Sequence, residues 1–275
     1  MDFLKPIWDP FIFNPMVNVL MGIYTVLAQF AIPGAYGLAI IIFTLLIRFI
    51  TLPFYSQTQK AMKKQQELMA GDKWKEIQKK YAKDKEKQQQ EQMKMYQEAG
   101  VNPFGSCLPM LIPWPVMVGL FQSITMVMGA QPEQLMDLSK HIYQFIPALA
   151  VAVPVNSNFL GLNLAGTASA LGGLYYLGPV IVVATTWIQQ KMMPVPTADP
   201  QSAQMNQSMQ MMMPLMMGFF TLNYPFGLSL YWIVFSVVGI IQQYMNTGWG
   251  NLFAGTPFAP ATQSANKGKK NVGTK

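Results

Sequence analysis

Apolar residues occur in long blocks along this chain of 275 residues, and short polar segments separate the blocks. Five blocks hold roughly 15 to 22 mainly apolar residues, about the length that a helix needs to cross a hydrocarbon core of about 30 Å. The pattern predicts an all-α polytopic membrane protein built on a bundle of five transmembrane helices. We place these spans at residues 35–57, 104–129, 171–193, 207–224 and 225–247, of which the fourth is short and begins with polar residues.

Residues 1–34 form a separate external segment in this scheme. Acidic residues and a proline interrupt the basic start that a signal peptide would need, so we expect no cleavage here. On a helical wheel the polar side chains fall in one narrow stripe. That stripe predicts an amphipathic helix lying in the membrane interface with its polar side toward water. The alternative is a further span whose stripe faces the bundle; the stripe consists of Asn14, Asn18, Thr25 and Gln29.

Lysine residues are distributed unevenly among the segments that connect the spans. Residues 58–103 hold eleven and the tail, residues 248–275, holds four, whereas the segments assigned outside hold only Lys5 and Lys140. The positive-inside rule therefore places residues 58–103 and the C-terminus in the cytoplasm and the N-terminus outside. Residues 130–170 become an external loop and residues 194–206 a cytoplasmic loop. The formal net charge of +7 is thus concentrated where anionic lipid, nucleic acid or acidic peptide could bind.

The basic segment, residues 58–103, has the composition of a helical structure. It is rich in Lys, Gln, Glu, Met and Ala, which are good helix formers. Trp74, Ile77 and Tyr81 follow the spacing of one apolar helix stripe, which is interrupted soon after Tyr81 and resumes by Tyr96. The pattern predicts a helical hairpin that projects into the cytoplasm. The alternative is a solvated, charged linker.

The sequence contains few residues that could carry out enzymatic catalysis. The chain has one histidine, His141, and one cysteine, Cys107, and the five predicted spans contain no Asp or Glu. Metal motifs such as HExxH or paired cysteines are missing, as is the phosphate-binding motif GxxxxGK[ST]. We therefore expect no catalytic residue, no metal site and no cofactor.

Arg48 carries the one formal charge well inside a predicted span. It lies about 20 Å along the helix from Ala35, in the half nearer the cytoplasm. Burying it there costs roughly 2.5 to 3.5 kcal/mol on insertion scales. A water-filled cavity open to the cytoplasm would lower that cost, and so would extension of the side chain to the inner headgroups. Polar residues of the spans that could line such a cavity are Thr44, Thr51, Gln122 and Gln189.

Four stretches, in this order and around a lysine-rich loop, resemble one known family. They are IRFITLPF (47–54), AGVNPFGSCLPMLIPWPV (99–116), LGPVIVVATTWIQQKM (177–192) and NYPFGLSLYWIVFSVVGIIQQY (223–244). Together they are similar to the YidC-type membrane protein insertases and their mitochondrial and chloroplast relatives. The resemblance covers nearly the whole chain, and any one stretch alone would be weak evidence.

The resemblance implies five core spans, a cytoplasmic helical hairpin and a positively charged groove that is open to cytoplasm and lipid but closed outside. The functional arginine of the family falls on Arg48, which favours the cavity over extension to the headgroups. Tyr231 and Trp232 are then further candidates for the groove lining. Two positions depart from the family pattern, since Pro113 replaces a usual Gln and Val237 a common Asn.

The external domain of Gram-negative relatives and a lipoprotein-type cysteine are also missing from this sequence. The chain is therefore similar to the minimal core form, and we expect it in a bacterial plasma membrane. The resemblance implies an insertase and chaperone, not an enzyme, that passes short external tails of client proteins through the groove. We expect it to function as a monomer, although the sequence does not determine the oligomeric state. The alternative is a channel or small-solute transporter that uses the same cavity, although rings of charged residues and an inverted repeat are not evident.

The implied partners are nascent membrane proteins, with the ribosome, the Sec translocon and anionic lipid at the cytoplasmic face as further candidates. Lysines of the hairpin would recruit clients or targeting factors, and lysines of the tail would bind the ribosome or another anionic surface. The hairpin set is Lys73, Lys75, Lys79, Lys80 and Lys83, and the tail set is Lys267, Lys269 and Lys270.

Overall fold

The computed structural model describes residues 5–82, 84–101, 113–127, 138, 140–143, 155–193, 200–249 and 252. These residues are mostly helical, and two short strands form one hairpin. The prediction of an all-α membrane protein is therefore confirmed. Three segments within this part of the chain are long and apolar enough to cross a membrane, namely Lys5–Gln29, Ala35–Ala70 and Phe226–Asn246. The count of five spans stays a prediction.

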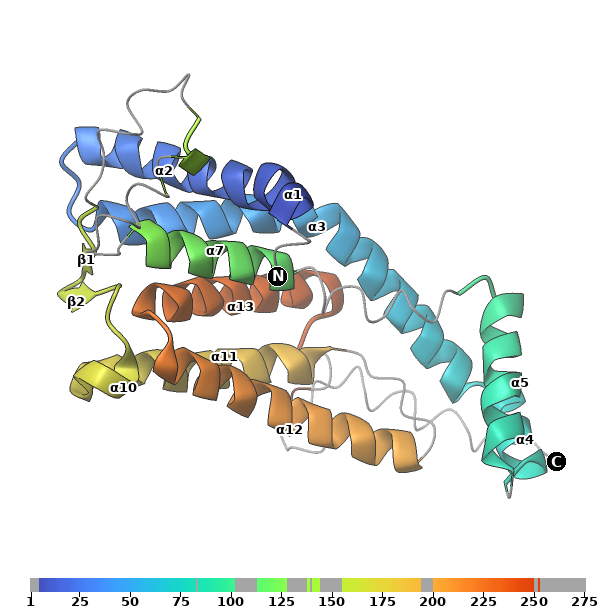
Figure 1. Cartoon of the computed structure of the whole chain (residues 1–275). Helices are drawn as coiled ribbons and strands as arrows, with labels where there is room; N and C mark the ends of the chain where they lie inside the picture. Colours follow the sequence, from blue (N-terminus) through green and yellow to red (C-terminus); the bar gives the residue numbers. More distant parts are fainter. Residues whose placement is uncertain are drawn as a thin grey trace.

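The longest helix, α3 (Ala35–Ala70), connects the bundle to the basic hairpin (Figure 1). It begins after Gly34, whose φ of 70° lies in the left-handed region that glycine adopts readily. A helix of this size is about 54 Å long at 1.5 Å per residue, which is well beyond a hydrocarbon core of about 30 Å. Residues 58–70, which we expected at the start of the hairpin, instead continue α3 out of the bundle.

The hairpin consists of α4 (Asp72–Lys80) and α5 (Lys85–Glu98) at the far end of α3 (Figure 1). The predicted stripe forms a small apolar core with the end of α3. Asp84 caps α5, because its carboxylate accepts a hydrogen bond from the Lys87 amide, and this bond lowers the pKa of Asp84. The segment is thus a folded hairpin and not a solvated linker. Its core comprises Met69, Trp74, Ile77, Met95 and Tyr96, with Leu68 and Tyr81 packed against them.

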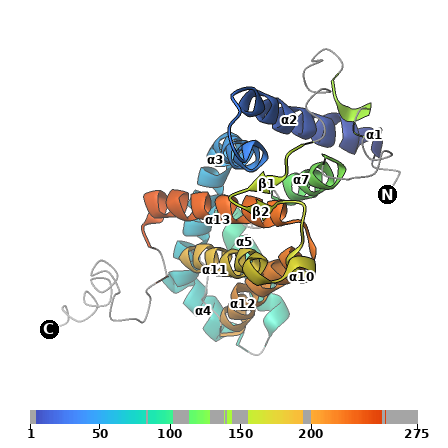
Figure 2. The same cartoon turned by 90° about the vertical axis from the view of Figure 1, so that its left-hand side faces the viewer.

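Helix α13 (Phe226–Thr247) lies at the centre of the bundle. It packs against α3 on one side and α11 (Leu177–Met192) on the other, and it also contacts α7 (Pro113–Val127). Helix α12 (Pro200–Asn223) packs mainly on α11 (Figures 1 and 2). The helix starts seven residues before the boundary that we placed at residue 207, although the side chains of its first turns lie outside the described residues.

Glycines allow these helices to approach closely. A Cβ at Gly178 of α11 would lie 2.6 Å from the Phe226 ring of α13, and a Cβ at Gly218 of α12 would lie 2.3 Å from Val183. In lipid, helix association depends on van der Waals packing, so small residues at such crossings stabilise the bundle.

The N-terminal segment comprises α1 (Lys5–Trp8), η2 (Asp9–Phe13) and α2 (Asn14–Gln29), and α2 packs along the first half of α3 (Figure 1). Asn18 is buried, donates to the His141 carbonyl oxygen at 2.8 Å and accepts from the Tyr143 amide at 2.8 Å. For this residue the expectation of a water-facing stripe was wrong, because the segment after the second predicted span covers it. The interfacial position of the helix stays a prediction, since Lys5–Gln29 is also long enough to span.

Residues 155–176 lie at the end of the bundle away from the hairpin (Figure 1). Strands β1 (Asn158–Phe159) and β2 (Leu162–Asn163) place the Phe159 ring against Gly34 and Gly37 at the start of α3. The amide of Phe226 donates to the Gly166 carbonyl oxygen at 2.8 Å, which attaches the same segment to the start of α13. Two short elements, α10 (Ala168–Leu171) and η4 (Gly173–Tyr176), then precede α11, so the block that we read as one span at 171–193 is interrupted.

Candidate functional site

Arg48 lies inside the bundle, 3% exposed, between α3 and α13. Its Nη2 atom donates to the Phe235 carbonyl oxygen, and its Nη1 atom donates to Gln242 Oε1 at 3.3 Å. The guanidinium carbon lies 3.5 Å from the centroid of the Phe235 ring, a cation–π contact worth roughly 0.5 to 2 kcal/mol. These contacts fix the orientation of the side chain.

The charge of Arg48 nevertheless stays unneutralised within the part of the chain that the structure describes. Its contacts there are to a carbonyl, an amide side chain and aromatic rings, and no carboxylate pairs with it. The Nε atom is buried without a hydrogen-bond partner. A buried donor left unpaired costs about 1 to 3 kcal/mol, so the site favours a ligand that brings an acceptor or a negative charge.

The residues of α13 around Arg48 lie on one face of that helix. Tyr231, Phe235, Gly239 and Gln242 recur at intervals of four, four and three residues, which places them on one side of a helix. Tyr231 is fully buried, its ring centroid lies 5.6 Å from that of Phe235, and its hydroxyl has no partner. We had named Tyr231 from the family resemblance but missed the other three residues. The helical spacing within NYPFGLSLYWIVFSVVGIIQQY could have identified them.

A second polar face belongs to α3 itself. Arg48, Tyr55 and Gln59 follow the i, i+7, i+11 spacing of one helix face, and all three are buried. The Tyr55 hydroxyl donates to Gln243 Oε1 at 3.2 Å, and Gln243 Nε2 donates to the Met192 carbonyl oxygen at 3.3 Å. Both amide atoms of Gln59 are buried without a partner. Buried polar groups therefore continue from Arg48 along α3 in the direction of the basic hairpin.

The predicted lining residues are only partly brought together. Gln189 of α11 is adjacent to Arg48, because a Cβ at Gly239 would lie 2.3 Å from Gln189 Nε2 and 2.5 Å from Arg48 Nη2. Thr44 and Thr51 lie on the neighbouring turns of α3, and their hydroxyls donate to carbonyl oxygens of their own helix.

Two further predicted residues have neighbours other than Arg48. Gln122 of α7 accepts a hydrogen bond from Trp8 Nε1 at 2.9 Å and so binds the N-terminal segment. Trp232 is 9% exposed, packs against Tyr231 and Phe235, and leaves its Nε1 atom without a partner. Val237, one of the two departures from the family pattern, is 39% exposed, and the side chain of Pro113 lies outside the described residues.

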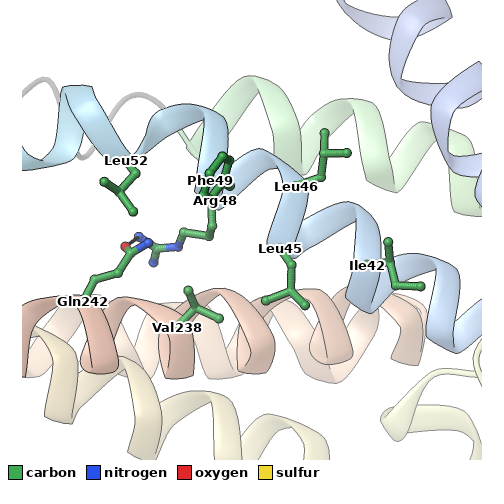
Figure 3. A pocket seen from close by; sticks show the side chains of 8 residues that line it. All are labelled: Ile42, Leu45, Leu46, Arg48, Phe49, Leu52, Val238 and Gln242. Atoms are coloured by element: carbon green, nitrogen blue, oxygen red, sulfur yellow. Dashed lines mark hydrogen bonds between the residues drawn. The ribbon is translucent and has the colours of Figure 1, made fainter.

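A crevice of about 490 Å³ borders Arg48 on the outer surface of α3 and α13 (Figure 3). Arg48 and Gln242 supply its polar groups, and the other lining side chains are apolar. We expected a polar lining, and of the residues named for it only Arg48 borders this crevice. Several of the apolar side chains are exposed, Phe49 to 78%, so the crevice opens at an apolar surface of the bundle. The apolar lining residues are Ile42, Leu45, Leu46, Phe49, Leu52 and Val238.

The lysines of the hairpin differ in whether they pair with a carboxylate of the hairpin. Lys73 Nζ lies 2.6 Å from a Glu98 carboxylate oxygen, and Lys75 Nζ lies 2.6 Å from an Asp72 carboxylate oxygen. Lys79 and Lys80 are exposed in the last turn of α4, and Lys80 lies 5.3 Å from the Tyr81 ring centroid. The remaining predicted lysines, Lys83, Lys267, Lys269 and Lys270, lie outside the described residues.

This arrangement defines a polytopic helical membrane protein that holds one uncompensated arginine inside its bundle and carries a basic hairpin at one end. Residues 26–250 match the family described as 60Kd inner membrane protein, and the chain belongs to this family. The resemblance seen in the sequence is therefore confirmed. Three of the four matching stretches lie mainly in α3, α11 and α13, the helices that carry Arg48 and its neighbours.

Curated relatives carry names that describe an activity. The chain is 36% identical over 212 residues to the "Membrane protein insertase YidC" of Caldanaerobacter subterraneus subsp. tengcongensis, covering 77% of this chain and 85% of that protein. It is 30% identical over 246 residues to "Inner membrane protein ALBINO3, chloroplastic" of Arabidopsis thaliana, covering 86% and 52%. It is 33% identical over 240 residues to the "Membrane protein insertase YidC" of Nitratidesulfovibrio vulgaris, covering 86% and 38%. This chain thus spans most of the first relative and about half or less of the other two.

The close packing at Gly239 can be tested with a pair of glycine substitutions. In an open helix position, Gly→Ala stabilises by about 0.5 to 1 kcal/mol, and Gly22 of α2 has such space, with nothing within 4 Å of a new Cβ. At Gly239 the methyl group would displace Gln189 and Arg48. We expect Gly22→Ala to raise the thermal unfolding midpoint in detergent and Gly239→Ala to leave it unchanged or lower it. Equal increases for both variants would contradict the packing described for Arg48.

Proposed function

We propose that this chain is a membrane protein insertase that passes short external tails of client proteins through its bundle by offering them the charge of Arg48. Family membership and the names of the relatives support the insertase role. The observation that carries the mechanism is an arginine that is 3% exposed and has no carboxylate partner among the described residues.

This site can lower the free-energy cost of moving a polar client tail across the membrane. A tail must bring polar backbone and acidic side chains through hydrocarbon, at a cost of several kcal/mol for each unpaired group. Buried polar groups at Tyr55, Gln59 and Gln243 provide hydrogen-bonding partners on the hairpin side of Arg48. Together with Thr44, Thr51 and Gln189, they would line a hydrated groove that reaches partway across the membrane, with Tyr231 and Trp232 beyond Arg48.

Arg48 then acts as a transient partner for an acidic tail. Opposite charges at contact distance attract by about 4 kcal/mol at an effective dielectric constant of 20, which offsets part of the cost of leaving water. With the cytoplasm negative, moving one negative charge outward gains about 2.3 kcal/mol per 100 mV, so the membrane potential can release the tail from Arg48. The apolar helix of the client would leave into lipid, and the sequence of steps requires no nucleotide, metal or cofactor.

The topology that fits this role has α3, α7, α11, α12 and α13 as the five spans. These elements would enter and leave lipid at the predicted boundaries, which are residues 35–57, 104–129, 171–193, 207–224 and 225–247. The N-terminus lies outside and the basic hairpin and tail lie in the cytoplasm, because lysines concentrate in those two segments. We place the chain in a bacterial plasma membrane, acting as a monomer.

The hairpin would receive partners at the cytoplasmic surface. Lys79 and Lys80 lie together in the last turn of α4, whereas Lys73 and Lys75 hold carboxylates of the hairpin itself. The first pair is therefore more accessible to the anionic surface of a ribosome that carries a client. The tail, with Lys267, Lys269 and Lys270, would add a second contact to the ribosome, and the Sec translocon is a further candidate partner.

The charge of Arg48 is tested by three substitutions. Arg48→Lys keeps a cation and should retain much of the insertion of clients with acidic tails. Arg48→Ala and Arg48→Glu should lower it about tenfold or more, because losing an interaction of about 1.4 kcal/mol changes a rate tenfold. Clients with uncharged tails should depend less on this residue. Insertion is measured by protease protection in liposomes that contain equal amounts of each variant.

Lys191→Ala serves as the matched control, because it removes a cation from the last turn of α11 without touching the Arg48 contacts. The unfolding midpoint of Arg48→Ala should stay near that of the unmodified chain, since the lost hydrogen bonds and the removed cost of burying a charge act in opposite directions. Full insertion of acidic-tailed clients by Arg48→Ala would disprove charge capture.

The hairpin is tested by replacing both Lys79 and Lys80 with Gln, which keeps the helix propensity of α4. Electrostatic binding weakens with added salt, so the variant should release ribosomes at a lower salt concentration than the unmodified chain. Co-sedimentation of ribosomes with proteoliposomes across a salt series measures this. Glu76→Gln, in the same helix, is the control and should bind at least as well as the unmodified chain. An unchanged release point for the lysine variant would exclude these residues.

A further inference from the structure

Residues 158–176 form what we call the outer collar, at the end of the bundle away from the basic hairpin (Figure 1). From His141 to Gln190 the sequence contains no Asp, Glu, Lys or Arg. A loop in water is normally enriched in charged and polar residues, so it is unusual that the 36 residues of this stretch that precede α11, residues 141–176, carry no such charge. The composition indicates that the collar has a less polar environment than bulk water.

The helix that follows the collar is too short to cross a membrane alone. α11 has 16 residues, which gives a length of about 24 Å, whereas the hydrocarbon core is about 30 Å thick. α10 and η4 precede it directly, separated from each other by Gly172, and Figure 1 shows α10 lying off the end of α11. These elements are in position to supply the missing apolar length.

Exposed apolar side chains run without interruption from α11 into the collar. On α11 they include Leu177, Val180 and Ile181, which are 50%, 61% and 41% exposed and face lipid if α11 is a span. Leu174, 61% exposed, and Leu171, 53% exposed, extend the same series at intervals of three residues. A lipid-facing surface therefore continues past the start of α11.

The collar is held firmly enough to keep these leucines at its surface. Leu164 is fully buried, and its carbonyl oxygen accepts a hydrogen bond from the Gly227 amide at 2.9 Å. The Tyr175 hydroxyl accepts from the Asn163 amide at 2.7 Å, and the Tyr175 ring meets the Phe226 ring edge-on. At the tip of the β1–β2 hairpin, Leu160 has a φ of 50° and is 85% exposed. That conformation is uncommon for a leucine, and burial within the protein does not compensate for it.

We propose that the outer collar is embedded in the outer leaflet of the bilayer, with Leu160, Leu171 and Leu174 in contact with phospholipid acyl chains. The collar thereby completes the lipid-facing thickness of α11. Because it packs against the start of α3 through Phe159 and is hydrogen-bonded to the start of α13, it also fixes the depth at which these two helices, and Arg48 with them, lie in the membrane.

The proposal is tested by the environment of a fluorescent label at single cysteines. In a Cys107→Ser background, which removes the one native cysteine, Leu160→Cys and Leu174→Cys are labelled with an environment-sensitive dye and reconstituted in phospholipid vesicles. Val180→Cys on α11 is the lipid standard, and Glu76→Cys on α4 is the aqueous standard. Quenching by nitroxide-labelled lipid is compared with quenching by iodide in the buffer.

We expect the labels at positions 160 and 174 to show the blue-shifted emission and the strong lipid quenching of the Val180 standard. Emission and iodide quenching like those of the Glu76 standard would overturn the proposal. Labels that are aqueous in vesicles and become shielded only when another membrane protein is added would also overturn it, in favour of a protein partner. Each labelled variant is checked for monodisperse elution in detergent, and Leu171→Cys takes the place of a variant that fails.

Discussion

A single positive charge that the bundle holds without neutralising it is the constraint on which the rest of this structure depends. Hydrogen bonds to Phe235 and Gln242 and the face of the Phe235 ring orient the guanidinium of Arg48, but the described residues provide no negative charge for it. A bundle that only needed stability could replace such a residue with an apolar one at little cost. The cost of leaving this charge unneutralised is the reason for our proposal that the arginine is kept for a ligand.

Two helices make that availability possible. α3 carries Arg48 inside the bundle and then continues to the basic hairpin, so one continuous helix connects the arginine and the hairpin. α13 packs against α3 and α11 and presents a glycine where the guanidinium and Gln189 need space. The outer collar packs against the start of α3 and is hydrogen-bonded to the start of α13, so contacts at the far end of the bundle hold these two helices together.

The sequence predicted which segments form helices better than it predicted which residues of different segments contact each other. The spacing of apolar residues and the composition were sufficient to predict the helical class and the hairpin core around Trp74, because buried positions recur at regular intervals along a single helix. Arg48 was identifiable because a charge inside an apolar block is rare. Gln122 was assigned to the wrong surroundings, since its distance along the chain says nothing about Trp8, its partner 114 residues away. Asn18 was misread for the same reason, because residues 141–143 cover it.

The residues of α13 around Arg48 show an intermediate case. Phe235, Gly239 and Gln242 share one helix face, which the sequence contains, but their contact with Arg48 depends on which face of α13 meets α3. That rotation is set by packing across the bundle, including the close approach of Phe226 to Gly178. Patterns within one segment therefore identified candidate site residues. The packing of the helices against each other determines which of these candidates contact Arg48.

Charge reversal on both partners tests the central claim most directly. In vesicles without a membrane potential, the unmodified chain and Arg48→Glu are each given one client in two forms, with acidic residues in its external tail and with lysines at the same positions. If Arg48 acts by its charge, the unmodified chain inserts the acidic form better and Arg48→Glu inserts the basic form better. If both chains prefer the same form of the client, or neither discriminates, the arginine does not act by pairing with the tail and the account is wrong.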